Sequence, residues 1–148
     1  MSNHQIDSDK LFAAIIRRIG KQLPSVLLEG MTADEIERFV LEGAATYCAK
    51  EYGYALNYHT LTKTDNLDLF WRKLDSHVRQ HGAGSILLAI WRSYNHWSCV
   101  KKVTERSIIL LDSMRLSRIH RTSIALKDDD NQRHLLCPQM TYLLSFRV

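Results

Sequence analysis

Proline, glycine and cysteine are all scarce in this chain of 148 residues, which contains only 2, 6 and 3 of them. A disordered tail or a flexible linker is usually rich in proline or glycine, whereas the few prolines and glycines of this chain are scattered singly. Three cysteines at irregular spacing do not make the even-numbered framework of a disulfide-rich secreted domain. The N-terminus also lacks a basic region followed by an apolar stretch, so we expect a reducing, cytoplasmic compartment.

Long hydrophobic runs are missing as well. The longest, Ile86–Trp91 and Ile108–Leu111, are far shorter than the roughly 20 residues that a membrane-spanning helix needs. Hydrophobic residues nevertheless make up 45% of the chain, which is enough for one core at this length. The sequence therefore predicts a single domain over residues 1–148 that does not enter a membrane.

The net charge of +4 is unevenly placed. Between Lys101 and Arg121 the lysines and arginines outnumber the two acids, Glu105 and Asp112. Such a segment could meet an anionic partner, but a solvated basic face is the commoner arrangement. The segment also lacks the interleaved aromatic residues of a base-stacking platform. We therefore do not expect a nucleic-acid partner, although a nucleic-acid-binding module stays an alternative.

Helical spacing of apolar residues dominates the first half of the chain. A cap at Ser8 or Asp9 would begin the first helix, and a capping box formed by Thr32 and Glu35 would begin the second. Glycines follow each predicted helix, as they commonly do at helix ends. The elements expected here are helices at 9–18, 32–51 and 67–81 and an edge strand at 54–61.

After Gly82 the hydrophobic period changes from that of a helix to that of a strand. The strands expected here are 85–91, 96–103, 106–112, 118–126 and 140–146, with an acidic solvated loop at 128–131. A tight turn at Thr104 and Glu105 would join the second and third of them. Helices followed by strands predict an α+β fold with N-terminal helices packed on a C-terminal antiparallel β-meander.

One end of the predicted hairpin carries a histidine and an aspartate. With the turn at Thr104 and Glu105, Trp97 lies opposite Asp112 and His96 lies opposite Ser113. A carboxylate beside an imidazole fixes the tautomer of the ring and stabilises its charged form, as a general base requires. A capped strand end, in which Asp112 binds backbone amides, explains the same residues and is favoured on geometry alone.

The stretch from Gly84 to Ser113 resembles the second half of the papain-like cysteine peptidases. A buried strand, a short turn, a His-Trp pair opening the next strand and an aspartate closing the third are most similar to the bacteriocin-processing domains that cut after double-glycine leaders. The resemblance implies that His96 is the general base and Asp112 its orienting partner. It also implies a peptide-binding cleft between the first helix and the His96 end of the meander, with Trp97, Asn95 and Gln5 as binding residues, and no cofactor.

The first helix departs from the pattern of that family at its start. The family has Cys-Gly there, preceded by a glutamine for the oxyanion hole, because a helix N-terminus lowers the pKa of a thiol. In this chain Ser8, Asp9 and Lys10 occupy that place, and Gln5 could stand for the glutamine. Ser8 is the only hydroxyl in the place expected for the nucleophile, and a helix cap is its commoner role.

None of the cysteines is a convincing replacement. Cys99 would point to the face of its strand opposite His96, Cys48 would lie near a helix C-terminus, and nothing brings Cys137 near His96. We expect all three to be small buried hydrophobic residues. Trp71 and Trp91 are expected in the core.

His77 and His81 lie one turn apart on a predicted helix, but no third ligand has matching spacing, so no metal site is expected. The leading hypothesis is therefore a catalytically degenerate papain-like domain that binds a peptide or a partner protein. An active hydrolase that uses His96 and Asp112 with an unidentified nucleophile is one alternative. A protein-neutralising factor, for which the sequence gives no positive sign, is another.

Overall fold

The computed structural model describes residues 5–92, 95–111, 116–128 and 130–147. These residues form helices and a mainly antiparallel sheet, which is the α+β class that the sequence predicts. The chain divides into two compact units, which we call unit 1 (residues 1–57 and 146–148) and unit 2 (residues 58–145). The single papain-like domain stays a prediction.

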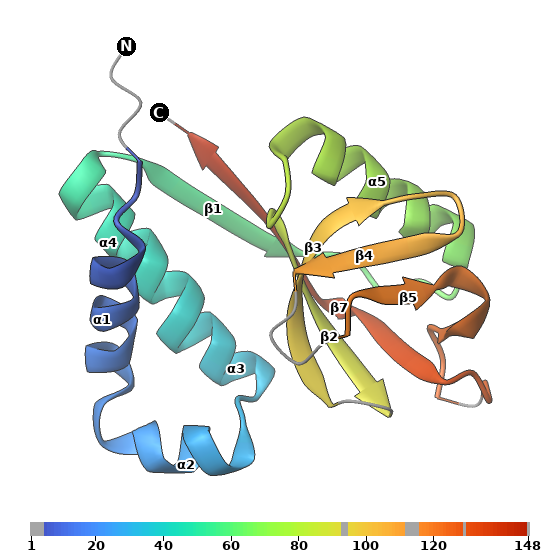
Figure 1. Cartoon of the computed structure of the whole chain (residues 1–148), viewed down its shortest axis with the longest axis horizontal. Coiled ribbons are helices and arrows are strands. Elements are labelled where there is room, and N and C mark those ends of the chain that lie inside the picture. The colour runs from blue at the N-terminus through green and yellow to red at the C-terminus, as the bar shows by residue number, and fades with distance from the viewer. Residues whose placement is uncertain (1–4, 93–94, 112–115, 129, 148) are drawn as a thin grey trace. The chain divides into compact units, whose positions relative to one another are not determined.

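Unit 1 is largely helical (Figure 1). Its helices are α1 (Ser8–Ile19), η1 (Gly20–Gln22), α2 (Leu23–Glu29), α3 (Ala33–Glu35), η2 (Ile36–Leu41) and α4 (Glu42–Tyr52). The cap of α1 is Asp7, not Ser8 or Asp9, because the Asp7 carboxylate accepts the N–H of Lys10 at 3.1 Å. Helix α2 was not predicted from the sequence.

The predicted second helix is confirmed and contains a π-helical segment. It begins with the capping box of Thr32 and Glu35 and ends at Gly53, whose φ of 71° is left-handed. Its middle part, η2, is a π-helix, in which the backbone bonds are wider than in an α-helix. Arg18 of α1 donates to the Arg38 carbonyl there at 2.6 Å and to the Glu42 carboxylate at 2.7 Å. The guanidinium thus satisfies groups at the π-helical segment.

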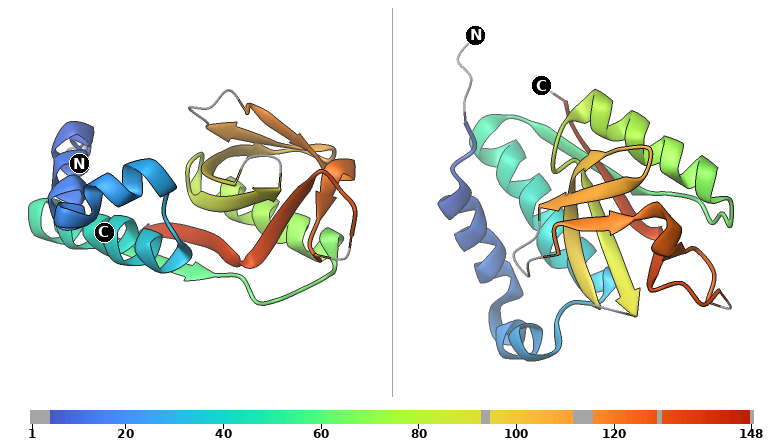
Figure 2. Two further views of the ribbon diagram at one scale, coloured as in Figure 1. Left: turned by 90° about the horizontal axis from the view of Figure 1, so that it is seen from below. Right: turned by 45° about the vertical axis from the view of Figure 1, so that its right-hand side comes forward.

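Helix α5 (Leu67–His81) of unit 2 agrees with its prediction at both ends. Asn66 caps it by accepting the N–H of Leu69 at 2.9 Å, and Gly82 follows the last turn. Its stripe of Phe70, Trp71 and Leu74 is buried. In Figure 2 the helix covers one face of the sheet.

Seven strands form the sheet within the described residues. They are β1 (Ala55–Thr60), β2 (Ile86–Arg92), β3 (His96–Val103), β4 (Ser107–Leu111), β5 (Arg118–His120), β6 (Ile124–Ala125) and β7 (His134–Arg147). The order is β1-β7-β2-β3-β4-β5, with β6 beside β7, so β2 to β5 make the predicted meander. The strand predicted at 118–126 is interrupted by a 3₁₀ turn, η3 (Arg121–Ser123).

Strand β7 starts six residues before the predicted position, at His134 instead of Met140. Leu88 pairs with Thr141 and Ile90 pairs with Leu136, so the β7 residues between these two pairs bulge from the ladder. Pro138 lies within that bulge, where a missing backbone N–H costs no ladder bond. The proline therefore interrupts the pairing without ending the strand.

The core of unit 2 lies between α5 and the sheet. Its fully buried side chains come from the helix and from β2, β3, β4, β5 and β7 and include Phe70, Leu74, Ile86, Leu88, Ile90, Val100, Ile108, Ile119 and Leu136. Trp71 is buried as expected, whereas Trp91 is only half-buried. Among the residues described, no helix combines the length and the apolar character needed to cross a membrane.

Candidate functional site

His96 is the first residue of β3, where the sequence places it, and its side chain is half-buried. It pairs with Ile90 of β2. Asp112 and Ser113 lie outside the described residues, so the pairing of His96 with Asp112 stays a prediction. Trp97, the next residue along β3, is half-buried, and its ring lies 6.1 Å from that of Tyr142.

The predicted register of the hairpin formed by β3 and β4 is wrong. The expected turn would place Cys99 opposite Leu110, whereas Cys99 pairs with Leu111. The turn lies one residue further along the chain than expected, with Glu105 and Arg106 between Thr104 and Ser107: the Thr104 N–H donates to the Ser107 carbonyl at 2.9 Å, and the Ser107 N–H donates to the Thr104 hydroxyl at 3.0 Å. The pairing also shifts between Val100 and Lys102.

The other predicted binding residues have local roles or belong to unit 1. Asn95 is exposed with a φ of 44°, and its side-chain oxygen accepts the N–H of Arg92 at 3.1 Å. Arg92 itself has a φ of 75°, so Arg92 and Asn95 both have a left-handed backbone conformation. Gln5 and Ser8 are exposed at the start of α1 in unit 1, and their roles toward His96 stay predictions.

Two of the three thiols, Cys48 and Cys99, are poor nucleophiles in this structure. Cys48 is buried as expected, and Cys99 and Cys137 are only half-buried, contrary to expectation. Burial raises the pKa of the Cys48 and Cys99 thiols, which disfavours the reactive thiolate. The partners of Cys99 and His96 in β2 are Leu87 and Ile90, an odd number of residues apart, so the thiol and the imidazole point to opposite faces as predicted.

Alkylation is expected to show this low reactivity directly. In the native protein near neutral pH, iodoacetamide should modify Cys48 and Cys99 about tenfold or more slowly than it modifies the same residues in urea, because both pKa values are raised by burial. Peptide mapping by mass spectrometry measures each site. Fast labelling of Cys99 that disappears in His96→Ala would contradict this assignment.

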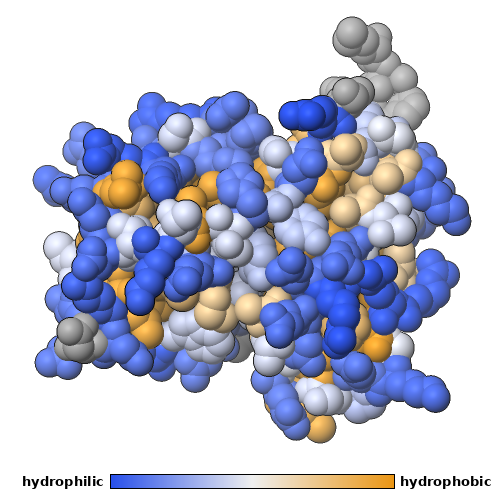
Figure 3. Space-filling view, turned by 180° about the vertical axis from the view of Figure 1, so that it is seen from behind, coloured by the Kyte–Doolittle hydropathy of each residue, from blue (hydrophilic) through white to orange (hydrophobic). Residues whose placement is uncertain are grey.

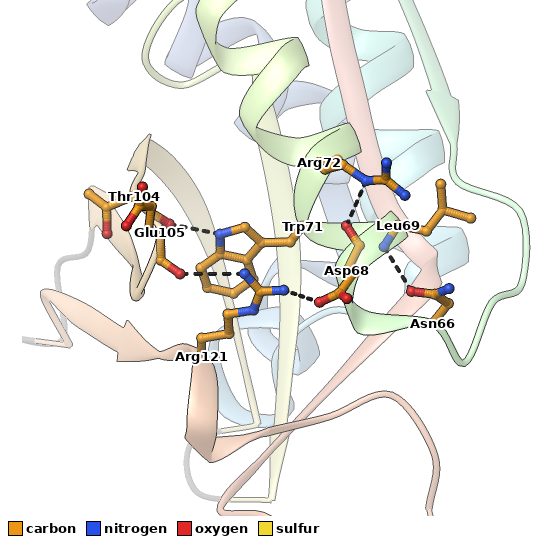
Figure 4. Close-up of polar contacts among 8 residues, drawn as sticks. All are labelled: Asn66, Asp68, Leu69, Trp71, Arg72, Thr104, Glu105 and Arg121. Atoms are coloured by element: carbon orange, nitrogen blue, oxygen red, sulfur yellow. Dashed lines mark hydrogen bonds and ion pairs between the residues drawn. The ribbon is translucent and has the colours of Figure 1, made fainter.

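Arg121, at the end of the predicted basic segment, is engaged in a structural contact (Figure 4). Its guanidinium lies 5.1 Å from the centre of the Trp71 ring and pairs with the Asp68 carboxylate. The Trp71 indole N–H donates to the Thr104 carbonyl at 2.7 Å. This cluster joins α5 to the loop between β3 and β4 and to η3, so Arg121 is not free to steer a partner.

The exposed apolar residues do not mark a site by themselves. In the view of Figure 3, hydrophilic side chains predominate and hydrophobic ones form separate patches. The large exposed hydrophobic residues are Phe12, Leu27, Leu28, Leu111 and Phe146. Nothing about these residues indicates what would cover them.

A groove beside α5 is the candidate site that the sequence reasoning missed. Its volume is about 600 Å³, and it lies within unit 2. It is lined by His59, Thr60, Leu61, Thr62, Leu69, Arg72, Lys73, Ser76, His77, Gln80 and Leu143. The α5 members recur at helical spacing, which is a signal in the sequence, but a polar helix face is usually just solvated. We call this feature the α5 groove.

Cationic side chains of the α5 groove have no acidic counterpart. Its lining includes Arg72 and Lys73 but no aspartate or glutamate. The two acids of α5 are engaged elsewhere, Asp68 with Arg121 and Asp75 with Arg79. Among the described residues, neither Arg72 nor Lys73 forms an ion pair. The groove is therefore electropositive.

His77, which lines the groove, joins α5 to β7. Its Nε2 lies 2.9 Å from the Leu144 carbonyl, and since a carbonyl only accepts, Nε2 carries the proton. The ring of His81 lies 4.4 Å away. Burial lowers the pKa of His77, and the nearby His81 and His59 lower it further against the opposing effect of the Leu144 carbonyl. Within the part of the chain that is described, no three potential ligands are arranged to hold a metal ion.

Mild acid is expected to destabilise unit 2 through two histidines. Burial lowers the pKa of His77 and His134 below 6.5, so the unfolded chain binds these protons more readily than the folded one. Their contribution is complete above that value and is lost as the pH falls through the folded pKa. Urea unfolding should thus give a free energy that decreases from about pH 7 to about pH 5, before most carboxylates titrate. In His77→Gln/His134→Gln the slope should flatten, and an unchanged slope would show that other groups cause it.

Comparison with known proteins gave no relative: no family model, no curated protein and no solved structure matches this chain. The papain-like resemblance therefore depends on the residues of the sequence, and the α5 groove depends on the structure.

Proposed function

We propose that this chain is a catalytically degenerate papain-like domain that binds an extended peptide, or an extended segment of a partner protein, in the α5 groove. The observation that carries the proposal is the position of the groove, with α5 on one side and His59–Thr62 of the β1 end on the other. Its volume of about 600 Å³ is within the range of ligand sites. A helix beside an exposed strand is also the arrangement in which several domains take up extended peptides.

The position of β1 in the sheet supports an extended ligand. β1 is the last strand of the order, so one of its edges has no neighbour among the described strands. The Leu61 N–H donates to the Thr141 carbonyl of β7 at 3.3 Å, so this peptide group faces the sheet. Because peptide groups alternate along a strand, that of Thr60, the last residue of β1, faces the other way. An extended segment that pairs with this edge would satisfy groups that water otherwise binds.

The chemistry of the thiols supports binding rather than hydrolysis. A papain-type reaction needs a thiolate beside an imidazole. Burial raises the pKa of Cys48 and Cys99, and Cys99 lies on the face of β3 opposite His96. A working hydrolase would need another nucleophile, and Ser8, which the Asp7 cap leaves in the first turn of α1, has no observed activating partner among the described residues.

A peptide-selection experiment tests this function. A phage-displayed library of random peptides is panned on the folded, immobilised full chain, and selected peptides are synthesised for calorimetry. We expect selected peptides to bind and Gln80→Trp, which fills the groove, to weaken binding by about tenfold or more, equal to about 1.4 kcal/mol. Arg79→Trp is the matched control, because Arg79 is an exposed neighbour on α5 that does not line the groove.

Two results would overturn the proposal. The first is a failure to select any peptide that binds the folded chain. The second is equal binding by the Gln80→Trp and Arg79→Trp proteins, which would place the peptide elsewhere. Circular dichroism of both variants confirms that each remains folded.

A further inference from the structure

We propose that the α5 groove selects peptides that carry acidic side chains, with Arg72 and Lys73 as the residues that bind the carboxylates. This inference rests on the proposed function and names the chemistry of its ligand. The two cations are consecutive residues of α5, and both line the groove.

The charge balance of α5 supports an anionic ligand. Helix α5 carries acids at Asp68 and Asp75, and each is paired with an arginine other than Arg72. Arg72 uses its Nε to donate to the Asp68 backbone carbonyl at 3.4 Å, a long bond that adds no negative charge. Its two terminal nitrogens, which bind a carboxylate in a bidentate manner, are not used in that bond. The groove therefore holds cations whose charge the protein itself leaves uncompensated.

In a second groove of unit 2, a positive charge is paired with an acid of the same groove. This groove has a volume of about 650 Å³ and is lined by Lys63, Thr64, Asp65, Leu126, Lys127 and Asp128. There, Lys127 forms an ion pair with Asp65 at 2.7 Å. This second groove is of similar size, but its internal ion pair gives it no preference for an anion. The α5 groove, in contrast, has cationic residues and no acidic ones in its lining.

Neutral donors around Arg72 and Lys73 complete the match to a carboxylate. Thr60, Thr62 and Ser76 contribute hydroxyl groups to the lining, and Gln80 contributes an amide. A carboxylate accepts several hydrogen bonds at once, so such donors add to the ionic attraction. The groove is partly open to water, so the attraction is expected to weaken with added salt. A peptide with acids at alternate positions presents them on one side of an extended chain.

Fluorescence polarisation with two labelled peptides tests the inference. The probes are Gly-Val-Glu-Val-Glu-Val-Gly and the same peptide with both glutamates replaced by glutamine. We expect the acidic probe to bind about tenfold or more tightly than the neutral one, and its affinity to fall with added salt. Arg72→Gln/Lys73→Gln should lose about tenfold or more in affinity for the acidic probe.

A charge-matched variant separates a local effect from the net charge. Lys102→Gln/Arg106→Gln removes the same two positive charges from exposed positions outside the groove, and its affinity should stay within about twofold of the unmodified chain. Equal losses in the two double variants would mean that only the overall charge matters, and would overturn the inference.

Three further results would also overturn the acidic preference. They are no binding of the acidic probe, equal binding of the two probes, and binding of a 12-nucleotide RNA through Arg72 and Lys73 when the acidic probe does not bind. The proposed function fails separately, because panning with random peptides and the Gln80→Trp variant do not depend on acidic residues. Selection of neutral peptides that Gln80→Trp excludes would keep the function and reject the preference.

Discussion

Replacing Trp71 with alanine is expected to lower the free energy of unfolding of unit 2 by about 3–5 kcal/mol. The side chain is 4% exposed, so the substitution leaves a large cavity between α5 and the sheet. It also removes the indole donor of the 2.7 Å bond to the Thr104 carbonyl and the ring beneath the Arg121 guanidinium. Native-state hydrogen exchange of the β2 and β3 amides measures the opening of unit 2 directly.

Two milder variants separate the contributions at this position. Trp71→Phe keeps most of the apolar contact and loses the indole donor, so it should cost less than Trp71→Ala. Arg121→Ala removes a partly exposed cation and should cost about 0.5–1.5 kcal/mol. A loss below about 1 kcal/mol for Trp71→Ala would show that the cluster in Figure 4 does not hold α5 in place.

Phe70→Ala is expected to cost a similar amount, about 3–5 kcal/mol, for a simpler reason. Phe70 is 0% exposed and belongs to the cluster of buried side chains between α5 and the sheet. The phenyl ring carries no hydrogen-bonding group, so the loss comes from the removed apolar contacts. Hydrogen exchange of the same amides in β2 and β3 measures the loss.

Phe12→Ala is the control for Phe70→Ala, because it removes the same side chain from an exposed position. Phe12 lies on α1 with 65% of its surface exposed, so its replacement should change stability by no more than about 0.5 kcal/mol. Urea unfolding followed by circular dichroism compares the two variants. Equal losses for Phe12→Ala and Phe70→Ala would contradict the burial that separates them.

The helices and strands of this chain could be predicted closely where local chemistry determines them. The capping box of Thr32 and Glu35, the Asn66 cap and the glycine at 82 mark helix ends by bonds within a few residues. The change of hydrophobic period after Gly82 identifies β2, β3 and β4 for the same local reason. The predicted cap of α1, Ser8 or Asp9, is wrong by one or two residues, because Asp7, Ser8 and Asp9 are all good caps.

Features that depend on distant residues could not be predicted in this way. The register of β3 and β4 differs from the prediction because the turn closed by Thr104 and Ser107 is displaced by one residue, and because the pairing shifts again between Val100 and Lys102. The π-helical segment η2 has a cation from α1 on one of its carbonyls, and nothing local in its sequence signals this contact.

The candidate site illustrates the same limit. His96 could be placed at the start of its strand from the alternation of residues alone. The α5 groove could not, because its walls come from segments that are separate in the sequence, His59–Thr62, α5 and Leu143. Arg72 and Lys73 have no acidic partner, and this can be recognised only from the structure, in which Asp68 pairs with Arg121. Counting charges along the sequence of α5 finds both acids but does not show that each is paired with an arginine.

Mapping a bound peptide by nuclear magnetic resonance tests the central claim most directly. A peptide selected by panning is titrated into the ¹⁵N-labelled full chain, and the amide shifts are followed. We expect the largest changes to fall on His59–Thr62 and on the groove-lining turns of α5, and Gln80→Trp to require about tenfold or more peptide to produce them. Changes concentrated elsewhere, and unaffected by Gln80→Trp, would contradict the claim that the α5 groove is where this protein binds its partner.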